Sequence, residues 1–274
     1  MHSEDYPKEP EGNFVPGIYN YCDRWCERCI YTDKCRLFAT ENIIKEDIAK
    51  KKEQEQSIER NKSFWNRIHK IIEEVEDLYD EPVVKEDDVT IPIFGKSEED
   101  EEAEEAMNEY EAFRNKAAQH PLTKAASKYS TEAYQWFKQR EETLKQHYNQ
   151  TTKEFRVTCQ GITDKEVLQK LAAAVEIILW YEFQLSIKIR RAFTSLNQEE
   201  AEPEFFEGIQ KDSEGSARVA LIGINRSISA WSYLLHHLET EKESIRLMIK
   251  TLMLLKMKME QTFPGAMNFK WPPE

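Results

Sequence analysis

Apolar residues recur at spacings of three and four through most of this chain, and segments that alternate apolar with polar residues are nearly absent. The first pattern gives a helix a continuous apolar face, whereas alternation is typical of a half-buried strand. Only 8 glycines and 10 prolines interrupt the 274 residues. The pattern therefore predicts an all-α protein.

The periodic signal is strongest after residue 121 and predicts four helices. They cover residues 122–157, 163–196, 214–238 and 240–263. The second and fourth begin at apparent capping boxes, Thr163 with Glu166 and Thr240 with Glu243, in which the two side chains satisfy free amides of the first turn. Two of the three connections are short, which places the helices they join antiparallel and adjacent. We therefore expect an up-down four-helix bundle.

Together with the sequence before residue 121, these helices divide the chain into four predicted regions. A long helix with apolar ends and a polar middle is expected before an acidic linker that contains two prolines, a glycine and a run of carboxylates. His120 and Pro121 should interrupt or restart a helix, because proline lacks an amide hydrogen. The predicted regions are a cysteine-rich metal-binding segment (1–40), the additional long N-terminal helix (41–79), a mobile acidic linker (80–105) and the helical bundle (106–274).

The charge balance argues against several classes of partner. With 51 acidic and 38 basic residues the net charge is -13, which repels a phosphate backbone and disfavours nucleic acid. The first residues, MHSEDYPKEPEGNF, lack an apolar targeting core, and no stretch approaches the roughly 18 apolar residues that span a membrane. We expect a cytoplasmic protein without a membrane partner. Thiols are kept reduced there, so clustered cysteines favour metal binding over disulfides.

Four of the five cysteines lie in one short window with the spacing C-x3-C-x2-C-x5-C. They are Cys22, Cys26, Cys29 and Cys35. If the first part of the window is helical, its three sulfurs share one stripe, and the fourth returns from a turn. Thiolates bind soft and borderline metals, and the neighbouring Arg24 and Arg28 help to keep the cysteines ionised. The window therefore predicts a four-cysteine metal site.

The spacing also bears on which metal is bound. Structural zinc usually takes two C-x2-4-C pairs separated by a longer loop, whereas the first two pairs here share Cys26. Iron–sulfur clusters are held by compact runs of cysteine, and six aromatic residues surround this run. We favour an iron–sulfur cluster, with zinc as the alternative.

Two partial resemblances support a cluster without implying an enzyme. C22-D-R-W-C26-E-R-C29 resembles the cysteine spacing of radical S-adenosylmethionine enzymes, but no β/α alternation follows, and Cys35 is available to occupy the open iron. C26-E-R-C29-I-Y-T-D-K-C35 resembles the end of the iron–sulfur staple in RecB-type nucleases, whose carboxylate and lysine nuclease core is not recognisable here. Only the local cluster-binding property is carried over.

A second candidate site consists of polar residues on apolar helix faces. Its members are Glu176, Glu182, Arg218, Asn225, Arg226 and His236. Buried carboxylates must be paired, hydrogen-bonded or protonated, so these residues predict either an internal salt-bridge network or a polar pocket. We prefer the structural network, because no nucleophile or cofactor motif accompanies it.

The leading interpretation is a non-catalytic metal-binding or redox module of a cytoplasmic helical protein, and the partner we expect is another protein. The first alternative is an enzyme or small-ligand binder whose pocket contains Glu176, Glu182, Arg218 and Arg226, with a purely structural metal. The second is an interaction scaffold that uses the long polar helix and the acidic linker. Metal content separates these three classes of protein best.

Overall fold

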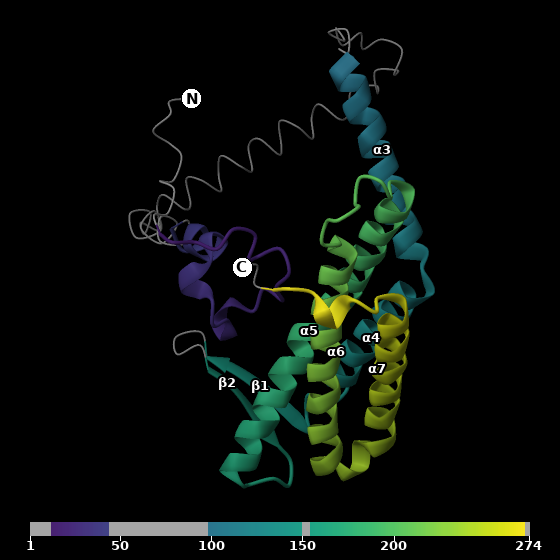
Figure 1. The fold of residues 1–274 in the computed structure, drawn as a ribbon. Coiled ribbons are helices and arrows are strands. Elements are labelled where there is room, and N and C mark those ends of the chain that lie inside the picture. The colour runs from purple at the N-terminus through teal and green to yellow at the C-terminus, as the bar shows by residue number, and fades with distance from the viewer. Residues whose placement is uncertain (1–11, 44–97, 150–153, 272–274) are drawn as a thin grey trace, which may run out of the picture. The chain divides into compact units, whose positions relative to one another are not determined.

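The computed structural model describes residues 12–43, 98–149 and 154–271, and these residues are mostly helical (Figure 1). Residues 36–43 form a short helical stretch besides the elements that follow. In chain order these are η1 (Cys26–Arg28), η2 (Thr32–Lys34), α3 (Glu98–Gln119), α4 (Pro121–Lys138), β1 (Leu144–Asn149), β2 (Glu154–Cys159), α5 (Lys165–Ala201), α6 (Asp212–His237), η4 (Glu239–Glu241), α7 (Lys242–Thr262) and η5 (Ala266–Asn268). The all-α prediction is confirmed in the coarser sense that the chain is mostly helical, with one two-stranded sheet in the described ranges.

The chain divides into two compact units. One comprises Met1–Pro16 and Cys29–Ala103, and the other comprises Gly17–Arg28 and Glu104–Glu274. In the described part of the first unit, η2 precedes the helical stretch, and the Val15 amide donates to the Lys34 carbonyl at 3.0 Å. The second unit contains the packed helices and the hairpin.

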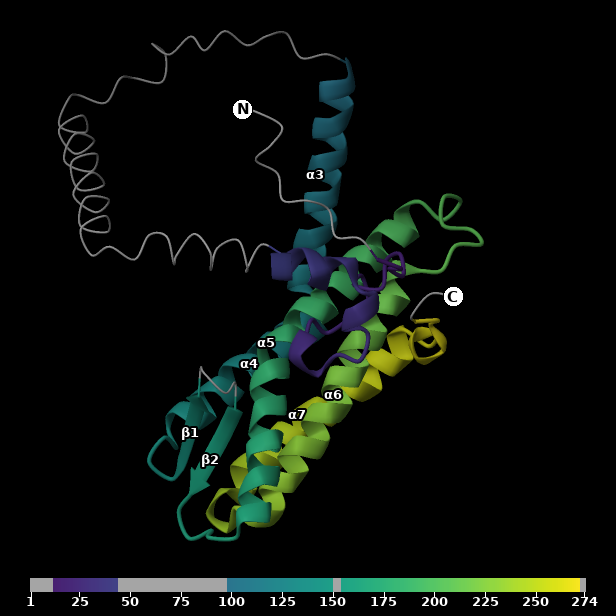
Figure 2. The same cartoon turned by 90° about the vertical axis from the view of Figure 1, so that its left-hand side faces the viewer.

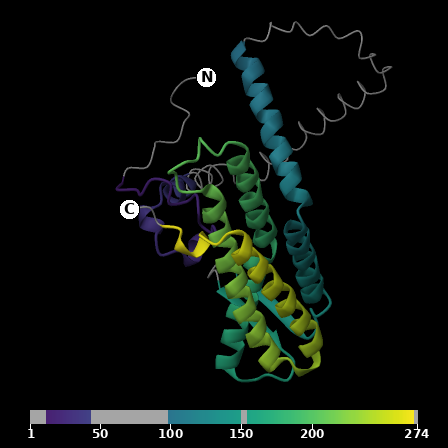
Figure 3. The same ribbon diagram turned by 45° about the vertical axis from the view of Figure 1, so that its right-hand side comes forward.

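The core of the second unit lies between four helices. α5 packs against α4 and α6, and α7 packs against α6 and α4 (Figure 3). Each helix contributes large side chains that are almost fully removed from water, which is the main favourable contribution to folding. They include Tyr129 and Trp136 from α4, Ile178 and Leu185 from α5, Leu221 and Trp231 from α6, and Ile245 and Leu252 from α7.

Helix boundaries follow the local chemistry, although two predicted caps are wrong. The prediction at His120 and Pro121 is confirmed: α3 ends at Gln119, and the His120 side chain accepts the Leu122 amide at 3.2 Å as the N-cap of α4. Asp164 caps α5, in place of the predicted Thr163, because its carboxylate accepts the amides of Glu166 and Val167. The second predicted box also fails, since α7 begins after η4 without a side-chain cap.

The predicted helix over 122–157 is wrong after Lys138. β1 and β2 form an antiparallel hairpin there, in which Leu144 pairs with Cys159, and β2 lies along α5 (Figure 2). Leu144, Val157 and Cys159 are buried, and Arg156 and Thr158 alternate with them in β2. This alternation of one buried face with polar positions is the strand pattern that was missed.

Two predicted regions lie mainly outside the described residues. Of the long helix at 41–79, residues 41–43 are helical, and the rest is outside those ranges. Of the acidic linker at 80–105, residues 98–105 belong to α3, so the linker prediction extends too far at its C-terminal end.

No helix in the described part of the chain is long and apolar enough to cross a membrane.

Candidate functional site

The segment Gly17–Arg28, which carries the first two cysteines, has an irregular backbone. η1 covers only Cys26–Arg28, so one helix does not run from Cys22 through Cys29 as the stripe of sulfurs would require. Arg24 adopts a left-handed conformation with φ at 60°, and the Asp23 side chain accepts the Trp25 amide at 3.1 Å. Left-handed backbone at a non-glycine residue is costly and persists only where surrounding contacts hold it.

Asp23 is the electrostatic anchor of this segment. Its carboxylate accepts hydrogen bonds from the Tyr181 hydroxyl of α5 and, at 2.9 Å, from the Arg226 guanidinium of α6. Burial and the adjacent Asp23 carboxylate raise the pKa of the Tyr181 hydroxyl, so this group remains a donor at neutral pH. Asp23 thereby ties the segment to two helices.

Trp25 is the apolar anchor. Only 8% of its surface is exposed, and its ring stacks on Trp180 with centroids 5.2 Å apart and meets Tyr181 edge-on at 6.1 Å. The indole N–H of Trp180 also donates to the Asp23 carbonyl at 3.1 Å. Aromatic pairs in such geometries stabilise beyond the area they bury. The segment therefore occupies a specific position on α5.

Cationic side chains of α5 hold the backbone on the N-terminal side of these anchors. Lys188 donates to the Cys22 carbonyl at 2.9 Å, and Arg191 donates to the Asn20 carbonyl at 3.2 Å. At the other end of the segment, Arg28 pairs with Glu176 at 2.8 Å. Hydrogen bonds from charged donors are stronger than those between neutral groups, so the backbone around Cys22 is held firmly.

Two glycines of α6 permit the close approach of aromatic rings. A Cβ at Gly223 would lie 2.7 Å from the Tyr181 ring, and one at Gly215 would lie 2.5 Å from the ring of Tyr21. Tyr21 also packs edge-on against Phe269, with centroids 4.6 Å apart. Larger residues at these two positions would displace the rings that position the segment.

The cysteines differ in their surroundings. Burial raises the pKa of the Cys22 thiol, while the nearby Lys188 opposes this shift, and the thiol donates to the Tyr19 carbonyl at 3.3 Å. In the other unit, the Cys29 sulfur accepts the Tyr31 amide at 3.4 Å. None of the five cysteines forms a disulfide. Across the described ranges, no group of three or more His, Cys, Asp or Glu side chains is arranged to hold a metal ion.

The six polar residues of the second predicted site do not form one pocket. Glu176 and Arg226 bind the cysteine-bearing segment, and Arg218 lies over the Trp271 ring at 5.7 Å. The Asn225 carbonyl accepts from Ser229, and His236 is exposed. Glu182 is partly buried, and its Oε2 atom has no hydrogen-bond partner among the described residues. Glu176 and Arg226 therefore hold the segment Gly17–Arg28 through Arg28 and Asp23 and do not pair with each other.

Several docking residues were missed by the sequence analysis. The α5 residues among them are Trp180, Tyr181, Lys188 and Arg191, and the segment supplies Asp23 and Trp25. A signal was present, because positions 176, 180, 184, 188 and 191 follow helical spacing and combine aromatic with charged residues. Such a stripe is typical of a face that binds a polar segment rather than a hydrophobic helix.

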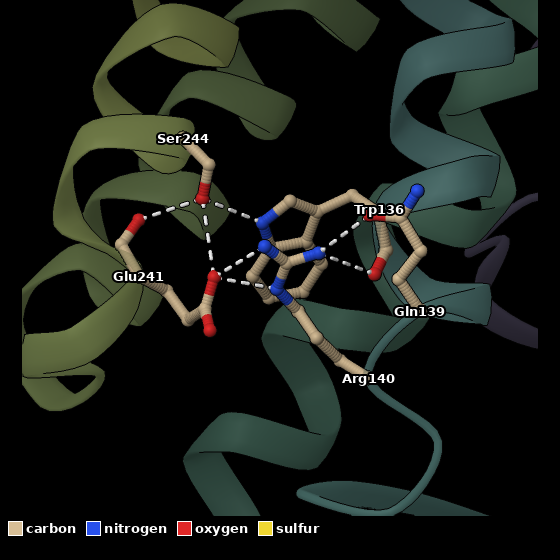
Figure 4. Close-up of polar contacts among 5 residues, drawn as sticks. All are labelled: Trp136, Gln139, Arg140, Glu241 and Ser244. Atoms are coloured by element: carbon tan, nitrogen blue, oxygen red, sulfur yellow. Dashed lines mark hydrogen bonds and ion pairs between the residues drawn. The ribbon is translucent and has the colours of Figure 1, made fainter.

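A separate polar cluster joins α4 to α7 (Figure 4). Arg140 forms an ion pair with Glu241 at 2.5 Å and lies over the Trp136 ring at 4.6 Å, while the indole of Trp136 donates to Ser244 at 2.9 Å. Trp136, Arg140 and Glu241 line a cavity of about 260 Å³ that also borders Cys159. The guanidinium donates to the Trp136 carbonyl as well, so its donors are used within the protein, and the cluster serves to connect elements.

Replacing Glu241 with glutamine should lower the free energy of unfolding by about 1 kcal/mol, because the largely buried Arg140 loses a charged acceptor. The matched control is Glu243→Gln, which removes an exposed carboxylate paired with Arg246 on the same helix and should change stability by less than about 0.5 kcal/mol. Urea denaturation measures both variants. Equal effects would show that the Arg140 pair is no more important than a surface ion pair.

The cysteine-bearing segment Gly17–Arg28 and the Arg140 cluster share none of the contacts described above. The first two thiols belong to a segment with fixed backbone contacts, whereas in the Arg140 cluster the guanidinium donates to Glu241, to Gln139 and to the Trp136 carbonyl. Comparison with known proteins adds no assignment for either site: no family model, no curated protein and no solved structure matches this chain.

Proposed function

We propose that this protein is a non-catalytic metal-binding or redox module in which Cys22, Cys26, Cys29 and Cys35 are the ligands. An iron–sulfur cluster is the favoured group, and zinc is the alternative. The observation that carries the proposal is the set of contacts that fixes the backbone of Gly17–Arg28, from the Lys188 bond at Cys22 to the Arg28 pair with Glu176. A ligand segment with a fixed backbone loses less conformational entropy when it binds a metal.

The chemistry of the donors supports the same proposal. Four thiols without disulfides lie within a short window, and thiolates are the preferred ligands of zinc and of iron–sulfur clusters. The Tyr31 amide donates to the Cys29 sulfur, and amide donors of this kind tune a bound cluster.

The four-helix bundle and the cytoplasmic location are parts of the same proposal. α4, α5, α6 and α7 contact one another in the order expected of an up-down four-helix bundle, and the short connection between α6 and α7 favours an antiparallel pair there. A cytoplasmic location follows from the reduced state that thiolate ligands need. A bound cluster would transfer electrons, and zinc would stabilise the fold. The contacts of the segment keep the Cys22 backbone in place in either case.

The test is the metal content of protein purified without oxygen, by elemental analysis and absorption spectroscopy. The wild-type chain should carry iron and sulfide with visible absorption, or one zinc without it. Cys26→Ser and Cys29→Ser should each lose most of the bound metal. Cys159→Ser is the matched control, because this buried thiol lies outside the window, and it should retain the wild-type content.

The outcomes distinguish the versions of this proposal. Colourless protein that contains one zinc per chain would exclude the redox version and keep the metal-binding one. Metal-free wild-type protein with five titratable thiols would contradict both. Equal metal loss in the Cys159 control would show that the window is not the binding site.

A further inference from the structure

The outer face of α7 combines large apolar side chains with cations. Its exposed members are Leu247 (55%), Met253 (58%), Leu254 (52%) and Met257 (42%), with Arg246, Lys250 and Lys258 among them. Steps of three and four residues place these positions on one side of the helix, opposite the buried Ile245, Leu252 and Met259. Contiguous exposed apolar surface of this kind marks an interaction site. We call these seven residues the α7 face.

The charge of the α7 face is opposite to that of the whole protein. α7 contains five basic and two acidic residues, a net charge of +3, in a chain whose net charge is -13. An anionic membrane would attract α7 but repel the rest of the molecule, so the charge balance disfavours a lipid partner. An acidic, partly apolar protein helix fits the face better, because it offers both contacts at once.

This chain itself contains a helix of that kind. α3 has nine acidic and two basic residues, a net charge of -7. Every residue from Met107 to Ala112 is exposed, including Met107 at 63% and Tyr110 at 46%. This stretch is exposed on all sides, so it gains little from packing, and a helix without such packing is only marginally stable. α3 therefore has both the charge and the unburied apolar side chains that complement the α7 face.

We propose that two copies of this chain associate, with α3 of each copy docked on the α7 face of the other. A two-fold arrangement satisfies both faces at once and closes the assembly, since each contact is repeated by symmetry. Apolar contacts of Met107 and Tyr110 with Leu254 and Met257 supply burial, while carboxylates of α3 face Lys250 and its neighbours. This interface does not depend on the metal proposal.

Sedimentation equilibrium of the full chain tests the proposal over a range of protein and salt concentrations. The wild-type chain should dimerise, and salt should weaken the dimer because exposed charges are screened. Lys250→Glu with Lys258→Glu should raise the dissociation constant by at least about tenfold, since carboxylates would then face carboxylates. The matched control is Lys124→Glu with Lys128→Glu on α4, which makes the same charge change at exposed positions and should leave the constant within about twofold.

A charge swap makes the test specific for α3. Glu109→Lys with Glu111→Lys should weaken the dimer alone and restore it when combined with the α7 reversal. A wild-type chain that is monomeric at all concentrations would overturn the proposal, whether or not it binds anionic vesicles. Equal effects of the α4 and α7 reversals, or a combined variant without restored association, would overturn it too.

Discussion

Replacing Trp25 with alanine should lower the free energy of unfolding by about 3–5 kcal/mol, the cost typical of removing a large buried aromatic side chain. The indole is 8% exposed and contacts both Trp180 and Tyr181. Without it, the segment retains polar contacts but loses its apolar anchor. If metal binding uses this segment, the same variant should also bind metal more weakly, because the ligand backbone is no longer fixed in advance.

Two controls make the Trp25 prediction specific. Trp25→Phe keeps a ring against Trp180 and should lose much less stability. Tyr134→Ala removes a large aromatic side chain that is 54% exposed, and its effect should stay below about 1 kcal/mol. Urea denaturation of the three variants, each with its metal content measured, provides the comparison. A Trp25→Ala protein as stable as wild type would contradict the docking of the segment.

The sequence predicted the long helices because their periodicity is local. α5, α6 and α7 carry apolar residues at spacings of three and four over many turns, so pattern alone identifies them. The break at His120 was also predictable, since Pro121 restricts the backbone directly. The cap of α5 is Asp164 and not Thr163. Both residue types can cap a helix, and the sequence pattern does not show which of two neighbours does so.

The hairpin and the docking contacts depend on information that is not local. The β1 and β2 strands are short, and their buried positions become apolar partners only when they lie on α5. Likewise, the cysteine spacing pointed to the segment Gly17–Arg28. The residues that bind this segment, such as Tyr181 and Arg226, lie more than a hundred positions away in the sequence. A polar residue on a helix face does not show from sequence which segment it binds.

Glu182 illustrates a part of the sequence prediction that can be tested through pH. The prediction of a buried carboxylate holds in part, because the side chain is partly buried and its Oε2 atom is unpaired within the described residues. Burial raises the pKa of this carboxyl from 4.5 to about 7, since the charged form loses hydration without gaining a partner. Near pH 7 about half of the folded molecules therefore hold this group protonated, and the other half hold it as a carboxylate in an unfavourable environment.

Replacing Glu182 with glutamine should stabilise the protein by about 2 kcal/mol above about pH 8, less than the full linkage of the pKa shift because the side chain is partly solvated. Between pH 4.5 and about 7 the folded state binds more protons than the unfolded state, so wild-type stability falls as pH rises. The variant lacks this loss, and the two proteins should converge below pH 4.5. Glu176→Gln on the same helix is the control: its carboxylate is paired with Arg28, so its loss should not stabilise. Parallel stability profiles of wild type and Glu182→Gln from acid to alkaline pH would show that this carboxylate is hydrated in the folded protein.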